Sequence, residues 1–121
     1  MIGVERVDFV SVPTRDPERA GAFYRDVLGL PPDARSEDEV VAGNLTLAFW
    51  NPEAEGLPFQ PNQAGIALRV PDVAEARDRL ERAGVEFLGE TVDTGVCHMG
   101  FFYDADGNVL ILHRRYAPYA G

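Results

Sequence analysis

The chain has 121 residues and a formal net charge of −9, with 45% hydrophobic and 26% charged residues. That length suits one domain, and the acidic balance argues against nucleic acid as a partner, because phosphate binding needs clustered Lys and Arg. No stretch approaches the roughly 20 apolar residues that a membrane span needs, and no signal segment opens the chain, so we expect a cytoplasmic protein without a membrane partner. The single cysteine, Cys97, excludes an internal disulfide and any Cys-rich metal site.

A strand, a helix and two further strands are predicted in the first half of the chain. The first strand alternates around β-branched residues. The helix begins after the N-cap signal Asp16-Pro17 and ends at Gly29, and the later strands join at the hairpin signal Gly43-Asn44. The strands predicted here are Val4–Val12, Val40–Ala42 and Leu45–Trp50.

The second half repeats this order after a proline-containing linker, Asn51–Asn62. Asp72 caps a predicted helix that ends at Gly84, and Asp104–Asn108 forms the turn before the last strand. The strands predicted in this half are Ile66–Val70, Val85–Leu88, His98–Tyr103 and Val109–His113. Each half is therefore about β-α-β-β-β, which gives module one as 1–60 and module two as 61–121.

Two motifs, together with this internal repeat, give the chain a family resemblance. The motifs are Phe23-Tyr24-x-x-x-Leu28-Gly29-Leu30 and Asp104-x-Asp106-Gly107-Asn108. The pattern resembles the vicinal oxygen chelate superfamily of glyoxalases, bleomycin resistance proteins and extradiol dioxygenases, over nearly the whole chain. The resemblance implies an α+β fold of two tandem βαβββ modules that form a cup-shaped mixed β-sheet with the helices outside and the ligand in the cup. It also implies a homodimer, which would protect the exposed edge of each short module.

The enzymatic members of that family bind a divalent metal in the cup through four side chains, typically His, Glu or Gln. Transferred one at a time, these positions fall on Phe9, Ala48 (or Leu47), Gly65 and Ile111. None of these side chains can coordinate a metal. We therefore expect no metal at the family position and no other cofactor.

Strand alternation predicts which side chains face the cup. A tight turn at Asp104–Asn108 would place His98 directly opposite His113 in the last hairpin, so that both histidines face the cup. The result is an aromatic and apolar site with a few polar groups, which is typical of a small-molecule site. The ligand-binding candidates are Phe9, Ser11, Ala48, Trp50, Arg69, His98, Phe102, Ile111 and His113.

Two functions are compatible with this pattern. The first is a metal-independent protein that binds a small aromatic or apolar molecule, as the bleomycin-binding relatives do. The second is an isomerase, epimerase or lyase that uses His98 as general acid or base, because an unperturbed imidazole titrates near pH ~6.5. Two alternatives stay open: the large apolar side chains could fill the cup as core, and His98 could bond only to backbone. The feature that separates catalysis from binding is an orienting partner for His98 inside the cup.

Overall fold

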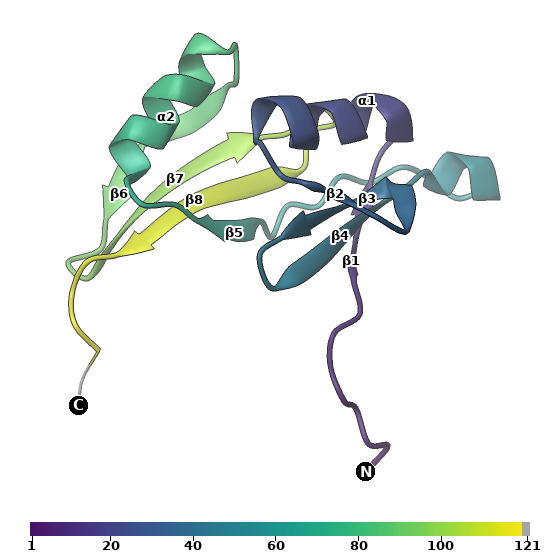
Figure 1. Ribbon diagram of the computed structural model, residues 1–121. Coiled ribbons are helices and arrows are strands. Elements are labelled where there is room, and N and C mark those ends of the chain that lie inside the picture. Colours follow the sequence, from purple (N-terminus) through teal and green to yellow (C-terminus); the bar gives the residue numbers. More distant parts are fainter. Residues whose placement is uncertain (120–121) are drawn as a thin grey trace. The chain divides into compact units, whose positions relative to one another are not determined.

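The computed structural model describes residues 1–119, which divide into two compact units, 1–60 and 61–119. In each unit a helix lies over one face of a four-stranded sheet (Figure 1). The elements of the first unit are β1 (Val10–Pro13), α1 (Pro17–Ala22), the π-helical turn η1 (Phe23–Val27), β2 (Pro32–Asp33), β3 (Ser36–Ala42), β4 (Leu45–Trp50) and the 3-10 turn η2 (Pro52–Glu55). Those of the second are β5 (Ile66–Arg69), α2 (Val73–Arg82), β6 (Phe87–Asp93), β7 (Cys97–Tyr103) and β8 (Val109–Arg115).

The two sheets have the same topology. The strand order is β1-β4-β3-β2 in sheet A, the sheet of the first unit, and β5-β8-β7-β6 in sheet B, the sheet of the second. The first and last strands of each unit run parallel, and the remaining pairs are antiparallel. The α+β class with two tandem βαβββ modules is thereby confirmed. No helix within residues 1–119 is long and apolar enough to cross a membrane.

Sheet A buries the face that meets α1. Asp16 caps the helix by accepting from Arg19 N, and Pro17 occupies the first turn, as predicted. Tyr24, from the π-helical turn, is fully buried and its ring packs 4.9 Å from that of Phe49. The other buried apolar side chains of this face are Val12, Val40 and Leu47.

The first strand is shorter than predicted. It begins at Val10 rather than Val4, and residues 1–9 run free of the sheet (Figure 1). Val10 pairs with Leu47, although β4 extends two residues beyond that pair. Residues 1–9 are all exposed, so no buried side chain holds them against the sheet, and Phe9 lies outside the strand.

Sheet B buries the face that meets α2. Asp72 caps this helix by accepting from Glu75 N, and Val73 and Leu80 are its buried residues. A Cβ on Gly100 would lie 3.7 Å from Val73, so β7 runs directly under the helix start. The predicted strand Val85–Leu88 is displaced and longer, and β6 carries an irregularity between Leu88 and Val92. Alternation could not predict that extension because a bulge breaks the period of two.

The turn between β7 and β8 is built on two buried polar side chains, Asp104 and Asn108. Asp104 accepts from the Asn108 backbone N–H (2.9 Å) and side-chain amide (2.8 Å). Asn108 Oδ1 accepts from Asn62 N at 2.7 Å. The motif Asp104–Asn108, which supported the family resemblance, is therefore a hydrogen-bonded turn that also binds the end of the linker at Asn62.

Asn108→Ala should lower the free energy of unfolding by roughly 1–3 kcal/mol, because it leaves buried partners unpaired. Urea unfolding measures the loss. Asn44→Ala, at an exposed turn position of the first unit, is the control and should change stability by no more than about 0.5 kcal/mol. Equal effects of the two substitutions would show that the turn network does not hold the hairpin.

Candidate functional site

Each unit carries its own candidate surface, the open face, which is the face of its sheet opposite the helix. On sheet A the open face carries Ser11 and Ala48, which are register neighbours, and Trp50 two residues further along β4. Glu39 pairs with Ala48 from β3 and adds a carboxylate to this face. Sequence reasoning missed Glu39 because it began this strand at Val40; the alternation of the polar Glu39 with the apolar Val40 was the available signal.

The open face of sheet B is mostly apolar. Arg69 and His113 are register neighbours at one end of this face and are its polar pair. Ala67 and Ile111, two residues earlier on each strand, are also register neighbours on this face. β6 and β7 add further apolar side chains to this face, among them Leu88, Val92, Met99 and Phe101.

The predicted pairing of the two histidines was wrong. His98 pairs with Arg114, and His113 pairs with Met99. The last pair before the turn is Tyr103 with Val109, so the whole segment Asp104–Asn108 lies in the loop and every pairing shifts by one residue. His98 therefore lies on the α2 side of sheet B, away from His113.

The same shift relocates Phe102, which was predicted to face the ligand. Phe102 is fully buried on the α2 side, with its ring 5.2 Å from that of Phe87. Phe101, the preceding residue of β7, lies on the open face, where Phe102 was predicted to lie.

His98 does have an orienting partner, but on the α2 side. Its Nε2 lies 3.4 Å from Asp93 Oδ2, and its ring packs 4.8 Å from that of Tyr116. The Tyr116 hydroxyl donates to Asp93 Oδ1 at 2.7 Å. The backbone N–H of Gly95 and then this hydroxyl lower the pKa of Asp93, and the bond to Asp93 raises the pKa of Tyr116.

His98 and Tyr116 line a hollow of about 550 Å³ in the second unit. Its walls come from the start of α2, from β6 and from the ends of β7 and β8. The lining residues are Pro71, Asp72, Val73, Ala74, Thr91, His98, Arg114, Arg115 and Tyr116.

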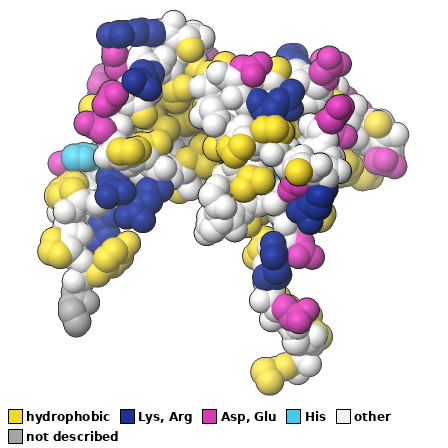
Figure 2. Space-filling view, in the orientation of Figure 1, with side chains coloured by type: hydrophobic (Ala, Val, Ile, Leu, Met, Phe, Trp, Pro, Cys, Tyr) yellow, Lys and Arg dark blue, Asp and Glu magenta, His cyan; other side chains and the backbone are white. Residues whose placement is uncertain are grey.

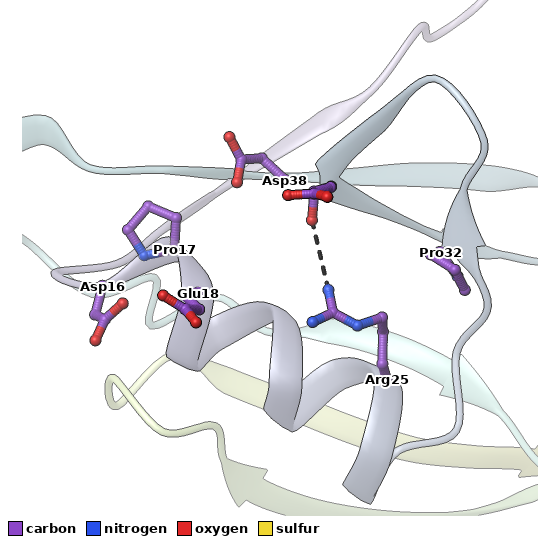
Figure 3. A pocket seen from close by; sticks show the side chains of 7 residues that line it. Asp16, Pro17, Glu18, Arg25, Pro32 and Asp38 are labelled. Carbon is purple, nitrogen blue, oxygen red and sulfur yellow. Dashed lines mark hydrogen bonds between the residues drawn. The ribbon is translucent and has the colours of Figure 1, made fainter.

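A second hollow, of about 870 Å³, lies beside α1 in the first unit (Figure 3). Arg25 reaches across it from the helical segment and donates to the Glu37 carbonyl at 3.4 Å. Asp16, Glu18 and Asp38 make the rest of the lining strongly acidic. It lies on the helix side of sheet A, and none of the residues predicted to bind ligand lines it.

The residues at the family metal position do not fit a metal. A phenyl ring, a methyl group, a hydrogen and a branched alkyl chain stand at Phe9, Ala48, Gly65 and Ile111, and none offers a donor. A Cβ on Gly65 would lie 3.0 Å from Ile111 Cδ1 and 3.3 Å from Val109 Cγ1, so the space for a ligating side chain is filled. Residues 1–119 also contain no group of three or more His, Cys, Asp or Glu that could hold a metal ion.

Comparison with known proteins confirms the resemblance drawn from the two motifs. Residues 6–112 match the family described as the Glyoxalase/Bleomycin resistance protein/Dioxygenase superfamily. An ethylmalonyl-CoA/methylmalonyl-CoA epimerase from Cereibacter sphaeroides is 32% identical, in a match that covers 74% of this chain and 77% of the epimerase.

Solved structures with a similar fold support the same assignment. TnmS3, an antibiotic binding protein from Streptomyces sp. CB03234, superposes with a TM-score of 0.74 at 27% identity, over 95% of this chain and 99% of that one. A superfamily member from Sphaerobacter thermophilus gives a TM-score of 0.74 at 24% identity, over 91% of this chain and 97% of that one, and supports the fold alone.

Gly65→Ala should destabilise the protein more than Gly84→Ala, and chemical denaturation measures both. Both glycines have positive φ, +84° and +89°, so each alanine costs about 1–2 kcal/mol of backbone strain. Only Gly65 also faces crowding, since nothing lies within 4 Å of a Cβ on Gly84. The crowding should add roughly 1 kcal/mol or more.

Adding Ile111→Val to Gly65→Ala removes the nearest atom and should recover part of the extra loss. Equal destabilisation by the two alanines would mean that Ile111 can move aside and that a side chain fits at position 65.

Proposed function

The chain belongs to the Glyoxalase/Bleomycin resistance protein/Dioxygenase superfamily, and we propose that within it the protein is a metal-independent binder of a small aromatic or apolar molecule. The observation that carries this proposal is the absence of any donor side chain at Phe9, Ala48, Gly65 and Ile111. Without donors at these positions, the chemistry that the family performs through a bound metal has no anchor.

The open faces supply what a binding protein needs. A small-molecule site is mostly apolar, with a few placed polar groups that fix the orientation of the ligand. Phe101, Met99 and Ile111 give sheet B such an apolar surface, and Arg69 beside His113 gives it a polar end. Trp50 and Ala48 contribute an aromatic and apolar surface on sheet A. The likeness to an antibiotic binding protein supports binding as the function.

A second candidate, an epimerase, is favoured by the relative that is 32% identical. Such an enzyme removes a proton from a carbon next to a carbonyl and returns it to the other side. His98, held by Asp93, is the available acid–base group. Its position on the α2 side of sheet B separates it from the open face, which is why we rank this candidate second.

Deuterium exchange separates the two candidates. Incubation with ethylmalonyl-CoA or methylmalonyl-CoA in D2O should leave the acidic carbon unlabelled if the protein only binds. Deuterium uptake that His98→Ala abolishes would establish the epimerase instead. The partner we propose is thus a small molecule, and the homodimer expected from the sequence stays a prediction.

Protein purified without chelator should contain well under one equivalent of Ni, Zn, Fe or Mn by elemental analysis. Its melting temperature should also be the same before and after dialysis against EDTA, because no donor set is available to a metal at the family position. Stoichiometric metal that survives dialysis, with a melting temperature that falls when EDTA removes it, would contradict the proposal.

Val92→Ser should weaken binding of the probe 8-anilino-1-naphthalenesulfonate at least several-fold, measured by fluorescence titration of the folded protein. Val92 lies on the open face of sheet B, and the substitution replaces apolar contact area with a hydroxyl. Val96→Ser is a matched control, because Val96 is exposed to the same degree (41% against 43%) but lies in the β6–β7 turn. Native mass spectrometry of freshly purified protein then searches for a bound natural ligand.

Equal affinities of the two serine variants would show that the probe does not use this face. The single tryptophan, Trp50, gives an independent reading, since a ligand that contacts the open face of sheet A should change its emission.

A further inference from the structure

We propose that the hollow beside His98 and Arg114, on the α2 side of sheet B, is a binding site for a small organic phosphate. It lies on the face of the sheet opposite the apolar surface described above. The inference is therefore independent of the proposed function, and each can fail without the other.

An arginine without an ion-pair partner among residues 1–119 lines this hollow. Arg114 is the register partner of His98, so their side chains project side by side from the same face. Arg114 is half-buried and has no hydrogen-bond or ion-pair partner among residues 1–119. The arginines of α2, by contrast, are each paired with a carboxylate, Arg77 with Glu81, Arg79 with Glu75 and Arg82 with Asp78.

No neighbouring carboxylate forms an ion pair or hydrogen bond with Arg114 among residues 1–119, because each one is bonded elsewhere. Asp93 is engaged by Gly95 N, the Tyr116 hydroxyl and His98. Asp72 accepts from Glu75 N as the helix cap. Arg115 folds back onto the carbonyls of residues 117 and 118. Basic side chains gather at this end of β8 beside a histidine (Figure 2), although the protein as a whole carries a net charge of −9.

The start of α2 adds backbone donors to the same hollow. The Asp72 side chain accepts a hydrogen bond from Glu75 N, and the Asp72 carbonyl accepts one from Ala76 N. The amides of Val73 and Ala74 have no acceptor within residues 1–119, and both residues line the hollow. Unpaired amides at a helix start favour an anion. They reinforce a site that the guanidinium and the imidazole define.

Phosphate suits these donors better than a carboxylate does. A guanidinium binds phosphate oxygens through two parallel hydrogen bonds, and several oxygens remain for the ring nitrogen and the amides. The volume of about 550 Å³ exceeds what an inorganic ion needs and falls in the range of small-molecule sites. The ring of Tyr116 and the side chains of Pro71 and Val73 offer apolar contact to the organic part of such a phosphate.

The test is calorimetric titration of the full chain with phenyl phosphate, with benzoate as the competing chemistry. Phenyl phosphate should bind with one-to-one stoichiometry and more tightly than benzoate. Arg114→Gln should weaken it at least tenfold, Arg114→Lys should weaken it less, and Arg82→Gln should leave it unchanged. Arg82 is the matched control because its side chain is 78% exposed and pairs with Asp78 on the outer surface of α2.

Backbone amide shifts in a nitrogen-15 correlation spectrum locate the ligand and verify that each variant is folded. The shifts should concentrate at Val73, Ala74 and Thr91. No saturable binding, a loss of affinity with Arg82→Gln equal to that with Arg114→Gln, tighter binding of benzoate, or shifts centred on Ala67 and Phe101 would each overturn the proposal.

Discussion

The hydrogen bonds between Asp104 and Asn108 set the register of the β7–β8 hairpin, and that register assigns a face to every side chain of the two strands. With these two residues buried and paired, the whole segment Asp104–Asn108 stays in the loop. Removing one residue from the loop would exchange the faces, because strand side chains alternate with a period of two. His98, Phe102 and Met99 therefore owe their surroundings to a turn that contacts none of them.

The two units share one topology and differ where a ligand would bind. Ser11 pairs with Ala48 in sheet A as Ala67 pairs with Ile111 in sheet B, and Trp50 occupies the place that His113 takes. The third strands diverge in the same way, with Glu39 facing Ala48 and Phe101 facing Ile111. The same topology and strand register thus present one partly polar face and one apolar face. Function in this fold follows from the side chains that the faces carry.

Local signals in the sequence predicted the fold well, and long-range pairing was harder. The caps Asp16 and Asp72 and the hairpin at Gly43-Asn44 act within a few residues, so the sequence carries them directly. The start of β1 depends on whether the residues before Val10 are buried against the unit, and the length of β6 depends on a bulge opposite β7. Neither is visible in the segment itself. For the candidate site, the main error of prediction lay in the β7–β8 hairpin. One loop residue more than predicted places His98 and Phe102 on the other face of the sheet.

The loss of the family metal donors is coupled to packing in the second unit. The Ile111 side chain fills the space above Gly65, and both stand at positions where the enzymatic relatives carry ligands. A donor at position 65 would have to displace Ile111 and also adopt a backbone conformation with φ near +84°, which side chains other than hydrogen rarely tolerate. A donor side chain at position 65 would thus meet both a steric and a backbone obstacle. The surface formed by Gly65, Val109 and Ile111 is apolar and closely packed. Under the proposed function, it therefore contributes shape and apolar contact to a ligand, and the polar contacts come from other side chains of the face.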